Sequence, residues 1–127
     1  MAGVTYATGA LVAAERNDRR MWALHAGFLA EEVAPVVPAP VVAEAWRGRA
    51  SQASLSRLLA LCDVEPLSDD QARRVGVLAG KASHDDIVDV TVVEGAARRG
   101  DAVVTSDQQH IRRVAAATGV RLVIEPV

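Results

Sequence analysis

The segment IVDVTVVEGAARRGDAVVTSD, residues 87–107, decides the fold. Its first half is apolar on nearly every side apart from Asp89, which is typical of a buried helix. Gly100 ends that helix, and the apolar run 102–105 then forms a short strand. A buried helix followed at once by a buried strand predicts an α/β domain, with a parallel sheet covered by helices.

The rest of the chain alternates in the same way between short apolar strands and helices. Strands are expected at residues 3–7, 36–37, within 62–67, at 102–105 and at 121–125, and helices are expected to begin near residues 8, 18, 41, 51, 68, 84 and 107. Ser51 is a candidate N-cap, and Ser68 with Gln71 forms a capping-box pattern. We therefore expect a single domain over residues 1–127 with five strands.

Composition limits the class of protein. The chain has 127 residues, a net charge of −2 and 3% aromatic residues, so neither bulk positive charge nor a base-stacking surface is expected to hold nucleic acid. A local basic groove beside an acidic site stays possible. The single cysteine, Cys62, favours a reducing intracellular setting, and no apolar run approaches the roughly 20 residues of a membrane span. We expect a soluble, cytoplasmic protein.

Three carboxylates lie where such a sheet binds ligands, beyond the carboxyl ends of its strands. Glu44 lies one turn into a helix after the second strand, and Asp107 follows the fourth strand. Asp89 lies in the apolar helix with no Lys or Arg within one turn, so its charge needs a partner or a metal. If the three converge, their oxygens suit Mg²⁺ or Mn²⁺.

Other polar residues near these strand ends have ordinary structural explanations as well. Asp86, Thr8 and Thr105 are candidates to support the acids, but each also fits a helix end or a backbone turn. Trp46 is expected to pack in the core, with stacking on an RNA base as the alternative. The three histidines show no zinc-binding spacing, so His25, His84 and His110 are expected to be structural or surface residues.

With these residues in place, the chain resembles the PIN-domain ribonucleases, and among them the VapC toxins of VapBC toxin–antitoxin pairs. The resemblance rests on the order and spacing of Glu44, Asp89 and the Thr105-Ser106-Asp107 element, and it spans essentially the whole chain. It implies a PIN-like three-layer fold with strand order 3-2-1-4-5. It also implies an endoribonuclease whose acids bind Mg²⁺ or Mn²⁺, in which one acid orients or deprotonates the attacking water.

The chain departs from the family pattern at Ala7. The family begins with a strand ending in a metal-binding Asp followed by Thr or Ser, whereas this chain has Ala7-Thr8. We interpret Ala7 as the position of a missing carboxylate, through a recent or engineered Asp-to-Ala change, because Asp89 and the other acids are kept. The chain is then expected to bind metal weakly and to cleave poorly.

The resemblance also implies partners. These are an RNA substrate, a VapB-type antitoxin that docks near the acids, and a second copy in a homodimer. The amphipathic segment 21–33 fits a docking surface for the antitoxin, and it fits ordinary core packing at least as well. Arginines on helices beside the strand ends are candidate RNA contacts, although each also fits a solvated helix face: Arg16, Arg19, Arg20, Arg47 and Arg49.

Two other classes of protein share features with this sequence. A non-catalytic PIN-like module that binds RNA or protein would carry Ala7 naturally. A response-regulator receiver domain has a similar length but needs an acidic pair after the first strand and a Lys after the last strand. The chain has neither.

Overall fold

The computed structural model describes residues 3–127, and it has an α/β fold with one five-stranded parallel sheet in the order β3-β2-β1-β4-β5. The strands are β1 (Val4–Tyr6), β2 (Val36–Pro38), β3 (Asp63–Glu65), β4 (Ala102–Thr105) and β5 (Ile124–Pro126). The helices are α1 (Thr8–Glu15), α2 (Arg19–Ala30), α3 (Ala39–Ala45), α4 (Ala53–Leu59), α5 (Asp69–Ala82), α6 (Ile87–Arg99) and α7 (Gln108–Thr118), with a short 3-10 helix η1 (Ala50–Gln52). The predicted fold class and strand order are confirmed.

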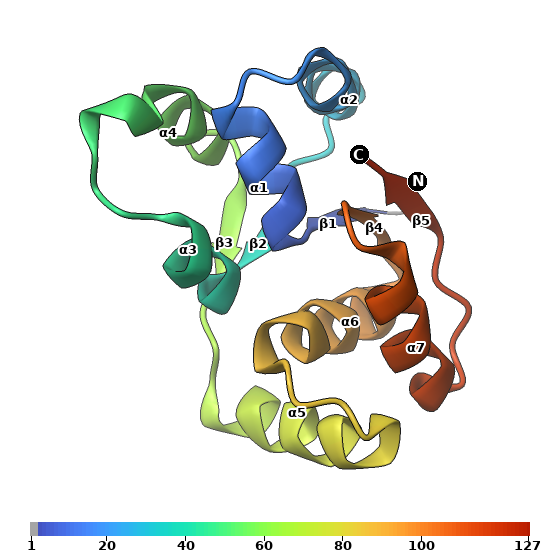
Figure 1. Cartoon of the computed structure of the whole chain (residues 1–127). Coiled ribbons are helices and arrows are strands. Elements are labelled where there is room, and N and C mark those ends of the chain that lie inside the picture. The colour runs from blue at the N-terminus through green and yellow to red at the C-terminus, as the bar shows by residue number, and fades with distance from the viewer. Residues whose placement is uncertain (1–2) are drawn as a thin grey trace.

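The sheet forms the middle of three layers (Figure 1). Helices α1, α2 and α4 lie on one side of it, and α5, α6 and α7 lie on the other. Helix α6 contacts β1, β2 and β4, whereas α5 packs on α6 and α7. Both faces of the central strands are therefore covered, which explains why β1 and the last three residues of β4 are fully buried and why their sequences are apolar runs.

Helix α6 is set by its two ends. The Asp86 carboxylate accepts hydrogen bonds from the backbone N–H groups of Val88 and Asp89, at 3.0 and 3.2 Å, and this fixes the first turn. Gly100 ends the helix with a left-handed φ of 76°, a conformation that glycine adopts without steric cost. The chain then turns directly into β4, so the decisive segment of the sequence forms the helix and strand that it predicts.

Several expected boundaries were wrong. The helix expected to begin near residue 84 begins at Ile87, because Asp86 is the extended N-cap residue. Ser51 lies in η1 and caps nothing; buried Gln52 anchors this turn instead, since its amide donates to the carbonyl of Ala45 at 2.9 Å. Only half of the capping box forms: Ser68 accepts from the N–H of Gln71, whose side chain donates to Glu65.

The last strand is also shorter than expected, since β5 begins at Ile124 and not at residue 121. Within residues 3–127, none of the helices has the length and apolar character needed to cross a bilayer.

Candidate functional site

The candidate site lies at the carboxyl ends of β1 and β4, where the two strands run side by side. The backbone N–H of Ala7 donates to the carbonyl of Val104 at 3.0 Å, so Ala7 continues the pairing of β1 with β4. Its side chain is buried with the core. Gly9 follows at the start of α1, and a Cβ there would overlap with Ser106, so this edge needs glycine for close packing.

Two of the predicted acids come together at this edge, with two histidines beside them. The Asp89 Oδ2 atom accepts a hydrogen bond from Nε2 of His84 at 3.3 Å. Nδ1 of His110 lies 2.7 Å from Oδ2 of Asp107 and 3.9 Å from Oδ2 of Asp89. The rings of the two histidines meet edge to face with their centroids 5.4 Å apart. The result is one cluster of His84, Asp89, Asp107 and His110, which we call the His–Asp cluster.

The carboxyl group of Asp89 lies in an environment that disfavours its charged form. Burial raises the pKa of the Asp89 carboxyl, and the charge of Asp86 raises it further; the hydrogen bond and charge of His84 oppose this, and the charge of Asp107 adds to the rise. A raised carboxyl pKa means that negative charge at this position is incompletely compensated. A bound cation would supply the missing compensation.

The predicted supporting residues lie around the cluster. The Thr105 hydroxyl accepts a hydrogen bond from the backbone N–H of Asp107 at 3.0 Å and so orients that residue. Asp86 caps α6 directly before Asp89. The Thr8 hydroxyl oxygen is buried and has no hydrogen-bond partner among residues 3–127, although it stands at the start of α1 beside Ala7.

Glu44 is not joined to this cluster. It is exposed on α3, and within the part of the chain that the structure describes its side chain makes no hydrogen bond or ion pair. Trp46, expected in the core, is 40% exposed because α3 ends at Ala45 and the chain turns outward. Helix α3 does contact α6, the helix that carries Asp89.

The candidate RNA-binding arginines are all exposed, but they differ in their neighbours. Arg16 lines a hollow of about 500 Å³ together with Thr8 and Ser106, so it faces the same edge as the cluster. Arg20 pairs with Glu125 at 3.2 Å. Arg47 donates to nearby backbone carbonyls.

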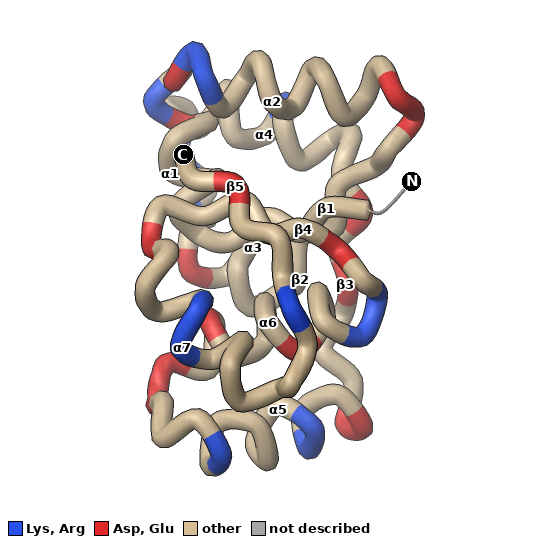
Figure 2. Tube along the Cα trace, turned by 90° about the vertical axis from the view of Figure 1, so that its right-hand side faces the viewer, with Lys and Arg blue, Asp and Glu red and all other residues tan. Residues whose placement is uncertain are grey.

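Arg19 begins α2 and Arg49 precedes η1. In the view of Figure 2, basic positions are scattered over α2, α5 and α7 with acidic positions between them.

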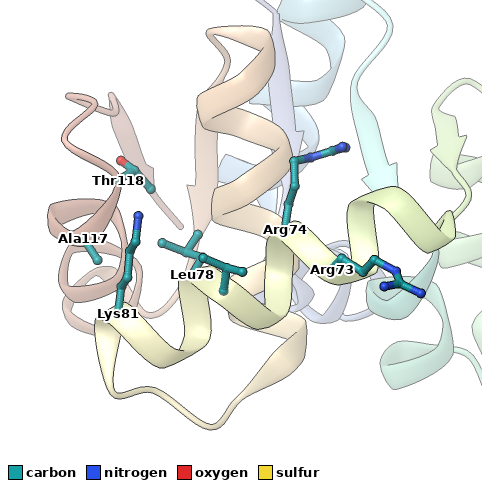
Figure 3. Close-up of a pocket in the computed structure, with 7 residues that line it drawn as sticks. Arg73, Arg74, Leu78, Lys81, Ala117 and Thr118 are labelled. Carbon is teal, nitrogen blue, oxygen red and sulfur yellow. The ribbon is translucent and has the colours of Figure 1, made fainter.

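A separate groove between α5 and α7, with a volume of about 360 Å³, lies outside this edge. Figure 3 shows Lys81 extending along it toward Thr118, while Arg73 points away from α7. Arg73 pairs with Asp69, and Arg74 pairs with Glu94. This groove contains none of the acids that the sequence singles out.

The metal-ligand set is incomplete in this chain. Within residues 3–127, no three His, Cys, Asp or Glu side chains converge so that they could hold a metal ion. The oxygens of Asp89 and Asp107 are of the type that suits Mg²⁺ or Mn²⁺. The chemistry of the donors therefore fits a divalent cation, whereas the number of converging donors falls short.

The two histidines of the cluster are the residues that sequence reasoning missed. His84 lies in the turn between α5 and α6, because Ser83 ends α5 with a left-handed φ of 50° and Asp86 delays the start of α6. A signal was present, since a carboxylate in an apolar helix without nearby Lys or Arg needs some partner. The nearest candidate partner was the histidine five residues earlier.

Comparison with known proteins gives likeness in structure only. The chain superimposes on the crystal structure of VapBC2 from Rickettsia felis, bound to a DNA fragment from their promoter, with a TM-score of 0.73, 15% identity and 97% of both chains covered. It superimposes on PAE2754 from Pyrobaculum aerophilum with a TM-score of 0.67, 16% identity, and coverage of 97% of this chain and 83% of that one. No protein-family model and no curated protein matches the sequence. The chain thus has the PIN-like fold, which it shares with the VapBC2 structure.

Proposed function

We propose that the chain is a single PIN domain over residues 1–127 of the VapC toxin type, a metal-dependent endoribonuclease in origin, disabled by Ala7. The main support is that Asp89 and Asp107 both approach His110 at the carboxyl edge of a PIN-like sheet. The first strand of that sheet reaches the same edge and is followed there by Ala7. The chain would act on cellular RNA in the cytoplasm, and a VapB-type antitoxin and a second copy of the chain would be its partners.

The roles follow from chemistry at this edge. Asp89 and Asp107 would hold Mg²⁺ or Mn²⁺, Glu44 would hold it through water, and position 7 would supply one more carboxylate in an active form. When bound, the cation would activate water and offset negative charge on the phosphodiester. Thr105 and Asp86 keep the backbone of Asp107 and Asp89 in place. Arg16, in the hollow beside Thr8, would contact an RNA phosphate.

Cleavage of RNA by this chain, Ala7→Asp and Ala7→Asn tests the proposal. The two variants differ in charge but hardly in size, so only Ala7→Asp restores a carboxylate. We expect cleavage by Ala7→Asp alone, in Mg²⁺ or Mn²⁺ and not in EDTA. Equal cleavage by Ala7→Asp and Ala7→Asn would contradict the metal-ligand role of position 7.

Two observations favour a second function. Ala7 is buried with the core, and no three donors converge among residues 3–127, so the chain also fits a non-catalytic module that binds RNA or protein. Such a module would bind RNA equally well as this chain and as Ala7→Asp, and neither would cleave it.

A further inference from the structure

The two histidines of the His–Asp cluster differ in how they are held. The His84 side chain is 10% exposed and donates its hydrogen bond to Asp89 from the turn before α6. The His110 side chain is 55% exposed and stands on the first turn of α7. One imidazole is therefore fixed by packing, while the other has room to rotate into solvent.

His110 lies in the gap between the two acids. Its Nδ1 atom is in contact with Asp107 Oδ2 at 2.7 Å, and it lies 3.9 Å from Asp89 Oδ2. The two carboxylates approach the same imidazole nitrogen, and two like charges at such close range repel each other. A side chain with an N–H group in that gap reduces the repulsion. It also stands where a cation shared by both acids would have to enter.

We propose that His110 is a displaceable occupant of the gap between Asp89 and Asp107, which a divalent cation must push aside, and that His84 is the fixed positioning residue of Asp89. This inference rests on the proposed function, because it assumes that the two acids bind a cation. The two histidines then act on metal affinity in opposite directions. Loss of His110 removes a competitor, and loss of His84 removes a support.

The magnitudes follow from the contacts. Loss of a hydrogen bond that orients a ligand typically weakens metal binding about 10- to 100-fold, so His84→Leu should weaken Mn²⁺ binding by about tenfold. A metal that enters between the acids must first break the contact of His110 with the Asp107 carboxylate. Because His110 is exposed, this contact lies at the low end for hydrogen bonds to charged groups, so His110→Ala should tighten Mn²⁺ binding by about tenfold.

Calorimetric titration with Mn²⁺, at one fixed pH of about 8 where an ordinary imidazole is neutral, tests this directly. Each variant is made both in this chain and in Ala7→Asp. Two conservative variants separate positioning from general structure: His84→Gln keeps an amide nitrogen near the place of Nε2, and His110→Asn keeps one near the place of Nδ1. Both should bind Mn²⁺ like their parent, and melting curves without metal show that each variant is folded.

Nuclear magnetic resonance supplies a readout other than affinity. In Ala7→Asp, added Mg²⁺ should shift the ring signals of His110 toward those of a solvated imidazole and leave those of His84 nearly unchanged. A His110 that only stabilises the fold would keep its signals.

The inference is overturned if His110→Ala binds Mn²⁺ no more tightly than its parent, or if His84→Leu binds it equally well. If Asp89→Asn abolishes Mn²⁺ binding while His84→Leu and His110→Ala bind like their parent, the inference about the histidines fails and the proposed function stands. If no variant binds Mn²⁺ in either background, Ala7→Asp included, both the inference and the proposed function fail.

Discussion

Replacing Arg99 with Met should destabilise the fold severely, because the Arg99 guanidinium, at the end of α6, donates hydrogen bonds to β1, to β3 and to the loop before β4. It donates to Asp101 at 2.9 Å, to Glu65 at 2.8 Å and to the Thr5 hydroxyl at 2.9 Å. The Asp101 side chain is only 5% exposed, so loss of Arg99 leaves its charge buried with Thr5 as the one remaining side-chain donor among residues 3–127. The network joins the loop before β4 to β1 and β3.

The expected magnitude comes from the uncompensated charge. Removing one partner of a buried ion pair costs about 3–5 kcal/mol. Because Glu65 keeps Arg98 at 3.0 Å, the lower end applies, and Arg99→Met should cost about 3 kcal/mol. At roughly 4 °C per kcal/mol for a domain of this size, the melting temperature should fall by about 12 °C.

Urea unfolding followed by circular dichroism measures this cost, with Arg73→Met as the matched control. Arg73 pairs with Asp69 at 3.1 Å, but both side chains are exposed, so its loss should cost about 0.3–0.5 kcal/mol. The double variant Arg99→Met, Asp101→Asn should cost less than the sum of the single ones, since asparagine leaves no buried charge. If Arg99→Met costs no more than Arg73→Met, the argument from buried charge is refuted.

Four further outcomes are expected. Burial alone would raise the pKa of Glu65, but hydrogen bonds and charges from neighbouring arginines lower it. The Glu65 carboxylate therefore stabilises the fold above its unfolded pKa of about 4.3, and this stabilisation is lost as the pH falls through the folded pKa. In urea unfolding at a series of pH values, Glu65→Gln should reduce the loss of stability at acid pH. The pKa of Asp89 is raised, chiefly by burial, so its charged form opposes folding at neutral pH. Without metal, Asp89→Asn should have a higher melting temperature than its parent at pH 7, and the two melting temperatures should agree below about pH 3.9. Gly9→Ala should lower the free energy of unfolding by about 1–3 kcal/mol, because the added Cβ overpacks against Ser106. Gly27→Ala should raise it by up to about 1 kcal/mol, because no neighbouring segment lies within 4 Å of the added Cβ. Thermal melts of the two variants test this difference. Burial, together with the charge of the next residue, raises the pKa of Cys62 to about 12, so iodoacetamide should label it slowly at about pH 8 and rapidly after unfolding in urea.

The sequence predicts those parts of the fold that local chemistry controls. The helix caps Asp18 and Ser68 and the helix-ending Gly119 all lie where their residue types indicate. Strand order is not a local property, and it followed from resemblance to a family. Ser51 failed as a cap because the buried side chain of Gln52 found better partners across the fold.

The site was only partly predictable for a similar reason. Asp89 and Asp107 follow from their places at the ends of elements, and the structure brings them together. His84 and His110 are 26 positions apart in the sequence and meet only because α6 and α7 pack side by side. No periodicity in the sequence encodes that meeting. The position of Glu44 on its helix could be predicted from the sequence, but the direction of its exposed side chain could not. The sequence therefore could not show that Glu44 stands apart from the cluster.

The outer position of α5 has a consequence for how the molecule opens. This helix packs on α6 and α7 and lies farther from the sheet than either of them (Figure 1). Unfolding of α5 would break its contacts with α6 and α7 and a few polar interactions, such as that of Gln71 with Glu65, but it would break no strand pairing. The backbone amides of α5 should therefore exchange with solvent through a partial opening that leaves the sheet intact, at a lower free energy than those of β1 and β4. Transient opening of α5 would also loosen the turn that carries His84, because this turn directly follows the helix. The geometry around Asp89 is therefore coupled to the opening of a helix that packs on α6 and α7 and pairs with no strand.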